Sequence, residues 1–288
     1  MSQSTVNKEN NGKLKAQRVF CYAVLIVLTF LSLFFFYMLF INSTRSHAAI
    51  GKGFSFIPGK STLVNLHNVL NNPNLPIVTG LINSIIVAGL SALFTVYFSS
   101  MTAYGIHVYD FKGKNQAFKL ILLIMMIPTQ VSALGFVQMM NKMGLRDNFI
   151  SLIVPAIAAP VTVFFMKQYM ESNLSIELIE AARVDGAKEF YIFNRIILPI
   201  FKPAMAVQAI FTFVGSWNNY FTPNLLLDSP EKKTLPILIA QLRSADFLKF
   251  DMGQVYMLIT LSILPVIVMY LILSKYIVGG VALGGVKE

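Results

Sequence analysis

The chain has 288 residues, of which 56% are hydrophobic and only 12% charged, and its mean hydropathy is +0.66. These values exclude an ordinary globular domain, in which about a quarter of the residues are charged, and predict a membrane protein. The net charge of +10 does not predict nucleic-acid binding, because the basic residues do not form one patch with interleaved aromatic residues.

Six long stretches of the sequence contain no Asp, Glu, Lys or Arg. Each reaches about the 20 apolar residues that a helix needs to cross roughly 30 Å of hydrocarbon. A charge at the centre of a bilayer costs on the order of 2.5 to 3.5 kcal/mol, so this pattern predicts an all-α protein with six transmembrane helices. The stretches are residues 19–41, 77–109, 120–141, 148–166, 203–227 and 252–274.

The polar segment 1–18 precedes the first stretch and is predicted to be a disordered N-terminal tail. With six spans both termini lie on one side, which then holds fourteen of the 23 Lys and Arg residues, against nine on the other side. The positive-inside rule therefore predicts a multi-pass protein of the cell membrane with both termini in the cytoplasm.

Some uncharged polar residues lie within or beside the predicted spans. Each must find a hydrogen-bond partner in the helix bundle or line a transport pathway, and packing is the simpler alternative for any single residue. A tryptophan followed by two asparagines combines an aromatic face with amides, which sugars bind, although tryptophan also marks the membrane interface. The candidate pathway residues are Asn83, Gln130, Trp217, Asn218 and Asn219.

The predicted inside loop, residues 167–203, gathers charges between apolar runs. Ile176, Ile179 and Ala182 have helical spacing, and Gly186 favours a turn after them. Asp185 is predicted to cap a second helix, whose residues Phe190, Phe193, Ile196 and Ile197 are spaced to face the bundle. Small residues beside the carboxylate of Glu180 would let another protein approach closely. An amphipathic helix lying on the membrane surface is the alternative.

The predicted outside loop, residues 223–251, is too long and polar for a simple turn. The three histidines are scattered, with no ligand spacing, so no metal site is predicted. The spans as predicted contain no acidic residue, which argues against a carrier driven by protons or sodium ions.

The inside loop resembles the "EAA" loop of the inner-membrane permease subunits of ABC importers. The pattern is matched by Glu180-Ala181-Ala182, Asp185-Gly186-Ala187 and Ile196-Ile197-Leu198-Pro199. From about Asn83 onward the chain is similar to the MalG-like, carbohydrate-uptake branch, for example in "WNNYFTPNLLL" and "SKYIVGGVALGGVKE". It departs from the pattern at Leu174-Ser175, where Ile-Pro is usual, and at His107, where arginine is common.

The resemblance implies a six-helix permease domain, residues 19–288, that forms the translocation pathway for a carbohydrate, in particular an oligosaccharide. In the family the EAA loop couples the membrane helices to the ATP-binding subunit. The coupling residues would be Glu180, Ala181, Ala182, Asp185, Gly186, Ala187, Leu198 and Pro199. The family's fifth-to-sixth loop meets the external binding protein, which assigns that contact to Gln241, Leu242, Arg243, Ser244, Ala245 and Asp246.

The resemblance also implies the partners: a second homologous permease subunit, two ATP-binding subunits and an extracytoplasmic sugar-binding protein. The sequence has no Walker A loop, so the chain is expected to hold no cofactor and to be no ATPase itself, with ATP and Mg²⁺ bound by the partner subunits. The alternatives are an importer of another solute, such as a polyamine or peptide, and a non-transporting membrane scaffold or receptor that docks a cytoplasmic protein.

Overall fold

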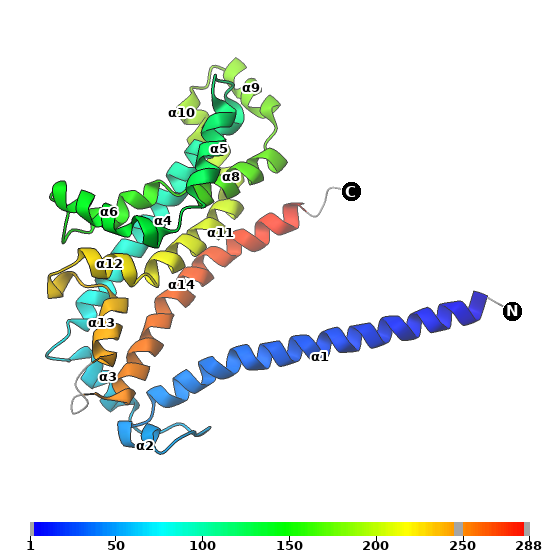
Figure 1. The fold of residues 1–288 in the computed structure, drawn as a ribbon. Coiled ribbons are helices and arrows are strands. Elements are labelled where there is room, and N and C mark those ends of the chain that lie inside the picture. The colour runs from blue at the N-terminus through cyan, green and yellow to red at the C-terminus, as the bar shows by residue number, and fades with distance from the viewer. Residues whose placement is uncertain (1–2, 245–249, 285–288) are drawn as a thin grey trace. The chain divides into compact units, whose positions relative to one another are not determined.

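The computed structural model describes residues 3–244 and 250–284, and all the regular secondary structure within them is helical (Figure 1). The chain divides into two compact units. Unit 1 comprises Met1–Leu70 and Asp246–Leu261, and unit 2 comprises Asn71–Ala245 and Ser262–Glu288.

Unit 1 is dominated by one long helix, α1 (Gln3–Ser43), which is followed by α2 (His47–Gly51) and α3 (Thr62–Leu70). The polar tail was expected to be disordered, but it is helical from Gln3 onward. Extending an existing helix needs no new nucleus, so the apolar span can propagate into the polar residues before it, which include no proline. The turn after α1 is closed by the buried Arg45, whose guanidinium donates to the carbonyl of Gly53 at 2.9 Å.

Unit 2 is built around α4 (Ile77–Val108), a 32-residue helix without proline. Its buried face is lined by small residues that recur every three or four positions, which lets neighbouring helices pack closely. These residues include Ser84, Ala88, Ser91, Ala92, Thr95, Ser99 and Ala103. The helices that pack on α4 are α7 (Ile150–Ile153), α8 (Pro160–Asn173), α11 (Leu198–Trp217) and α13 (Leu235–Arg243).

Five helical stretches of the described chain are long and apolar enough to cross a membrane, and a bent pair makes a sixth. The five are Gln17–Ser43, Ile77–Val108, Ile150–Asn173, Glu189–Trp217 and Met252–Ile277, the last within α14 (Met252–Gly284). The prediction of six transmembrane helices in an all-α protein is therefore confirmed, with the bent pair counted as one span.

The bent pair is the third predicted span, which was expected to be continuous over residues 120–141. It consists of α5 (Lys114–Ile124) and α6 (Thr129–Lys142), whose axes differ by 99°. The break falls before Pro128, because proline has no amide hydrogen to donate and disfavours the helical conformation of the residue before it.

The fifth span was predicted over residues 203–227 but runs from Glu189 to Trp217. The helix starts earlier because α10 (Glu189–Tyr191), a π-helical turn at Ile192–Ile197 and α11 join without interruption. It ends earlier because Asn218 caps it, and the chain then forms the separate short helix α12 (Phe221–Leu226).

The two ends of α4 meet different parts of unit 2 (Figure 1). The α4 C-terminus lies beside α9 (Ile176–Val184) and α10, and we call this region the α9 end. The α4 N-terminus contacts α13 and the short 3₁₀ helix Pro230–Lys232, and we call this region the α13 end. At 1.5 Å per residue, the two ends are about 48 Å apart.

Candidate functional site

The short helix α9 has well-defined limits. It begins at Ile176, directly after Ser175 in an extended conformation, so the departure from the usual Ile-Pro leaves the start of the helix intact. It ends in a Schellman motif: the amide of Ala187 donates to the carbonyl of Ala182 and that of Gly186 to Arg183, both at 3.0 Å. Gly186 has φ +79°, a conformation that favours glycine.

Asp185 was predicted to cap the following helix, but it is the C-terminal cap of α9. The following helix begins at Glu189, with Lys188 as its extended N-terminal cap. The Schellman motif uses Gly186 and Ala187 to close α9, so the backbone becomes extended only at Lys188.

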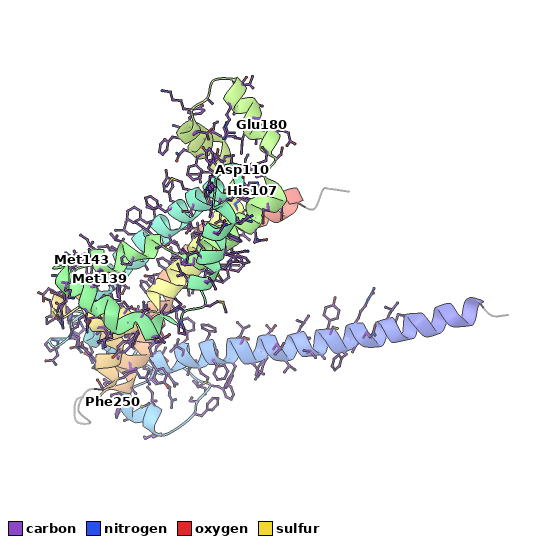
Figure 2. The ribbon with its side chains drawn as sticks, turned by 45° about the horizontal axis from the view of Figure 1, so that its top comes forward. His107, Asp110, Met139, Met143, Glu180 and Phe250 are labelled. Carbon is purple, nitrogen blue, oxygen red and sulfur yellow. The ribbon has the colours of Figure 1, made fainter. Side chains whose placement is uncertain are left out.

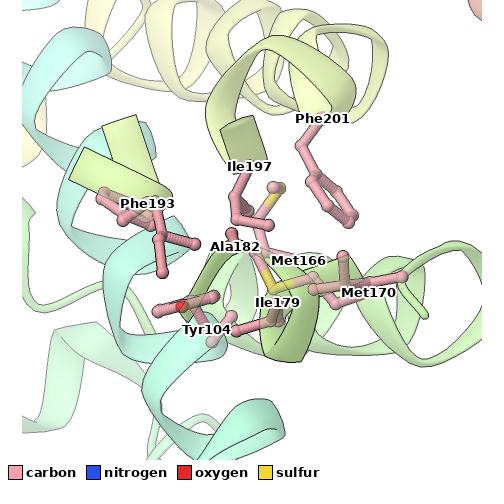
Figure 3. Close-up of a cluster of buried hydrophobic side chains, with 11 residues drawn as sticks. Tyr104, Met166, Met170, Ile179, Ala182, Phe193, Ile197 and Phe201 are labelled. Atoms are coloured by element: carbon pink, nitrogen blue, oxygen red, sulfur yellow. The ribbon is translucent and has the colours of Figure 1, made fainter. Parts of the chain in front are cut away.

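One face of α9 is buried and the opposite face is exposed. Ile179 and Ala182 point into a cluster of apolar side chains at the α9 end (Figure 3). This cluster, which we call the α9 core, consists of Ala103, Tyr104, Met166, Met170, Leu174, Ile179, Ala182, Ile192, Phe193, Ile197 and Phe201. It joins α9 to α4, α8 and the first part of the fifth span.

The predicted coupling residues gather around α9. Glu180, Ala181, Asp185 and Gly186 are exposed, whereas Ala182 is buried. Ala187 and Leu198 are partly buried against the α9 core, and Pro199 is exposed near it at the start of α11. Figure 2 shows Glu180 at the end of unit 2 that also carries His107 and Asp110.

The apolar stripe predicted after Gly186 is only partly correct. Phe193 and Ile197 are buried, but Phe190 is 70% exposed and Ile192 is buried in its place. The cause is the π-helical turn at Ile192–Ile197, in which residues five positions apart, such as Ile192 and Ile197, share a face.

A polar cluster that was not predicted from the sequence links three elements at the α9 end. The Nε of Arg183 donates to Oε1 of Glu189 at 2.6 Å. The hydroxyls of Tyr104 and Tyr109 donate to Oε2 of the same carboxylate, at 3.1 and 2.5 Å. The guanidinium of Arg183 also lies over the ring of Tyr109, 5.6 Å from its centroid. We call these four residues the Arg183–Glu189 cluster.

The electrostatics of this cluster agree with its hydrogen bonds. Burial and then the adjacent Glu189 raise the pKa of the Tyr109 hydroxyl above its usual value, so it remains a donor at neutral pH. The hydrogen bond to Glu189 raises the pKa of the Arg183 guanidinium further. The i,i+6 separation of Arg183 and Glu189 matches no helical pattern, so only the glycine turn between them could have suggested that they meet.

A second polar cluster lies near the α13 end, where the chain between α6 and α7 meets the chain after α12. Asp147 adopts a left-handed conformation, φ +54°. Its Oδ1 accepts the amides of Asp228 and Ser229 at 2.9 and 3.1 Å, and its Oδ2 accepts Lys232 Nζ at 3.1 Å. Arg146 makes a two-pronged contact with the carboxylate of Asp228, at 2.7 and 3.1 Å.

We expect Asp147→Asn to loosen this connection. The hydroxyl of Ser229, two backbone amides and Lys232 hold the pKa of the Asp147 carboxyl well below its ordinary value. The folded state therefore favours the ionised form of the Asp147 carboxyl. The resulting stabilisation of the folded state is complete above the unfolded-state pKa of about 3.9, and it is lost as the pH falls below that value. Hydrogen exchange at the Ser229 amide should be constant between pH 7 and 5, after correction for intrinsic rates.

In the Asp147→Asn variant the amide hydrogen of Ser229 should exchange about tenfold faster at neutral pH than in the unmodified protein. Asparagine tolerates the backbone conformation of residue 147 but lacks the negative charge. Asp110→Asn, at an exposed position of the α9 end, is the control and should leave this exchange unchanged. Equal exchange in the Asp147→Asn variant and the unmodified protein would contradict the assignment.

Asn83, a candidate pathway residue, lies in the first part of α4 and is buried. Its amide nitrogen donates to the carbonyls of Glu231 and Lys233, at 2.8 and 3.1 Å. The next residue, Ser84, accepts the amide of Leu235 at 2.7 Å. Both side chains therefore hold the segment that leads into α13. This agrees with a role in packing rather than in lining a transport pathway.

The other candidate pathway residues do not gather at one place. Trp217 is buried, stacks on Phe213 and donates to the carbonyl of Ser262 at 3.1 Å. Asn218 is exposed, and Asn219 accepts the amide of Thr222 at 3.2 Å. Gln130 is exposed in the first turn of α6.

The predicted binding-protein contact falls at the end of α13. Arg243 and Ser244 are exposed, Gln241 is partly buried and Leu242 is buried. Ala245 and Asp246 lie outside the described residues. Most of the predicted outside loop is thus folded into α12, the 3₁₀ turn and α13. Helix α13 packs on α4, and its residues Leu235, Ile237 and Leu238 are buried.

Among residues 3–244 and 250–284, no three His, Cys, Asp or Glu side chains are grouped so that they could hold a metal ion. The described residues instead offer two polar clusters and one short helix with an exposed face. These features define a multi-span, all-helical membrane component in which a small surface helix is attached to the inner packing of the bundle.

The chain belongs to the family described as "Binding-protein-dependent transport system inner membrane component", which matches residues 95–281. The arabinooligosaccharides transport system permease protein AraQ of Bacillus subtilis is 41% identical over 208 residues, covering 71% of this chain and 72% of that protein. The lactose transport system permease protein LacG of Rhizobium radiobacter is 29% identical and covers 92% of this chain and 95% of its own length.

The fold is also similar to a chain in the crystal structure of a bacterial ABC transporter involved in the import of the acidic polysaccharide alginate. The TM-score is 0.78 at 25% sequence identity, over 91% of this chain and 97% of that chain. The resemblance seen in the sequence to permease subunits of ABC importers is therefore confirmed.

Proposed function

We propose that this chain forms part of the translocation pathway of an ABC importer for a carbohydrate, in particular an oligosaccharide. ATP would be hydrolysed by separate subunits, with Mg²⁺ bound there. Two ATP-binding subunits, a second homologous permease and an extracytoplasmic sugar-binding protein would complete the transporter. Both termini and α9 would face the cytoplasm, and the α13 end would face outward.

The observation that carries the coupling part of the proposal is the construction of α9. Its buried face belongs to the same apolar cluster as residues of α4, α8 and the fifth span. Its other face exposes Glu180 and Ala181, where a second protein can approach. A pull on α9 from outside would therefore act on three membrane helices, as alternating access driven by a soluble ATPase requires.

The carbohydrate part of the proposal is supported by the relatives. AraQ and LacG are named for sugars, and the alginate importer for a polysaccharide. Another relative is the sn-glycerol-3-phosphate transport system permease protein UgpE of Yersinia pestis, so family membership alone does not fix the solute. The substrate needs a direct test.

We expect vesicles that contain the complete transporter to accumulate labelled oligosaccharides in the presence of ATP and the binding protein. Arabino- and malto-oligosaccharides are the probes, and spermidine and a tripeptide are the matched competitors. An accepted oligosaccharide should raise both uptake and ATP hydrolysis, because a loaded binding protein promotes the outward-open state. Stimulation by spermidine or the peptide, with none by either sugar, would replace the carbohydrate proposal by the other-solute alternative.

A further inference from the structure

We propose that the Arg183–Glu189 cluster positions the coupling helix, so that α9 moves as one body with the ends of the second and fifth spans. This inference rests on the proposed function, because it assigns a role to residues beside the expected ATPase contact. It adds four residues that the sequence motif does not single out: Tyr104, Tyr109, Arg183 and Glu189.

The apolar contacts of α9 cannot fix its direction by themselves. Only Ile179 and Ala182 of α9 are buried, and the hydrophobic effect that holds them is non-directional. A short helix held through one isoleucine and one alanine could tilt or turn on the α9 core and still keep that area buried.

The covalent connection does not fix the direction either. Asp185, Gly186 and Lys188 are exposed, and Ala187 is only partly buried. The Arg183–Glu189 contact spans this turn, with Arg183 in the last turn of α9 and Glu189 at the first position of α10. It thus supplies a directional side-chain link across this exposed turn.

The carboxylate of Glu189 connects all three elements because both of its oxygens are used. Oε1 accepts Arg183 from α9, and Oε2 accepts Tyr104 of α4 and Tyr109 directly after it. Rotation of α9 relative to α4 would break at least one of these hydrogen bonds. The geometry therefore couples the angle of α9 to the end of the second span as well as to the start of the fifth.

The cluster is better suited to orientation than to general stability. The side chains of Arg183 and Glu189 are 37% and 42% exposed, and ion pairs with such exposure contribute little to folding. Variants of this pair should therefore insert and assemble normally, which allows their effect on coupling to be measured in the complete transporter.

The test compares Arg183→Met, Glu189→Gln and the charge reversal R183E with E189R in reconstituted vesicles. The readouts are the number of oligosaccharide molecules imported per ATP hydrolysed, co-purification of the ATP-binding subunits, and hydrogen exchange within α9. The single variants should lower transport per ATP by about 2- to 20-fold, with the ATP-binding subunits still bound and exchange in α9 faster. The charge reversal restores an ion pair between α9 and α10 but not the acceptor for Tyr104 and Tyr109, so it should recover only part of the loss.

Glu171→Gln is the matched control, because it removes the Lys167–Glu171 ion pair at the same end of unit 2 without touching α9. It should leave the number of oligosaccharide molecules imported per ATP hydrolysed unchanged. Tyr109→Phe removes one hydroxyl only and provides a milder variant, with a smaller loss, should Arg183→Met fail to assemble.

An unchanged number of oligosaccharide molecules imported per ATP in both single variants, or a charge reversal that transports no better than Arg183→Met, would overturn the positioning role. Loss of the ATP-binding subunits from Arg183→Met would also overturn it, because Arg183 would then be a docking residue. Glu180→Lys separates this result from failure of the proposed function: if that variant keeps full coupling, α9 is not the coupling helix at all.

Discussion

Glu180→Lys should reduce uptake to below about a tenth of its normal level while the subunit still inserts and assembles with its permease partner. Glu180 is exposed on α9 and outside the α9 core, so its replacement leaves the internal packing intact. In the proposed contact the carboxylate of Glu180 would meet a cationic donor of the ATP-binding subunit, which a lysine would repel. Like charges at an interface cost several kcal/mol, far more than a tenfold loss requires. Uptake and ATP hydrolysis in vesicles measure the effect.

Gly186 offers a second, graded test of the same helix. A β-carbon added at this position would have no atom within 4 Å, so a substitution acts only through the backbone at φ +79°. Gly186→Val should be strongly impaired, since a β-branched residue tolerates this conformation poorly, whereas Gly186→Asn should be mild.

Asp110→Lys is the charge-matched control for Glu180→Lys, because Asp110 is exposed at the same end of unit 2 (Figure 2). It should transport normally. Normal uptake by both Glu180→Lys and Gly186→Val would rule out a coupling role for α9 and favour a subunit that is not driven through this helix.

Gly80→Ala should displace α13 from the second span. A β-carbon at position 80 would lie 2.2 Å from Cδ1 of Leu238 and 3.3 Å from the carbonyl oxygen of Lys233. Leu238 is fully buried, so it cannot swing away unless its neighbours move too. Overpacking of this kind typically costs about 1 to 3 kcal/mol.

The proposed binding-protein contact follows directly after the displaced part of α13. Stimulation of ATP hydrolysis by the binding protein should therefore fall, while the basal rate remains. Gly89→Ala is the control: Gly89 lies in α4, as Gly80 does, and no atom lies within 4 Å of its added β-carbon. It should be neutral or slightly stabilising. Full stimulation of the Gly80→Ala transporter would place the contact elsewhere or show that α13 adapts.

The sequence predicted those features that depend on composition and short-range spacing. Charge-free stretches identified the membrane helices, and the 3.6-residue period placed Ile179 and Ala182 on one buried face. The errors occur where a local change in the backbone, such as a proline or a π-helical turn, interrupts the regular α-helical spacing. Pro128 splits the third span, and the π-helical turn makes Ile192 rather than Phe190 a core residue.

The limits of the fifth span were wrong for a related reason. The predicted fifth span began directly after Lys202, the last charged residue before it. In the structure Glu189, Arg195 and Lys202 all lie within the continuous helix. A helix can extend past the apolar slab into water or into polar contacts, so the absence of charge marks the hydrocarbon segment and not the helix ends. The partners of Glu189 and Asp147 depend on tertiary contacts and could not be read from spacing.

The length of α4 has a mechanical consequence. The helix has no proline and holds the α9 core at one end and the chain leading into α13 at the other. As a lever arm of about 48 Å, it would carry its far tip through about 12 Å for a swing of about 15°, a rotation of the size seen in subunit rearrangements. If α9 is the coupling helix as proposed, a small movement at the α9 end would thus become a displacement at the α13 end that is large enough to admit or exclude a sugar ring.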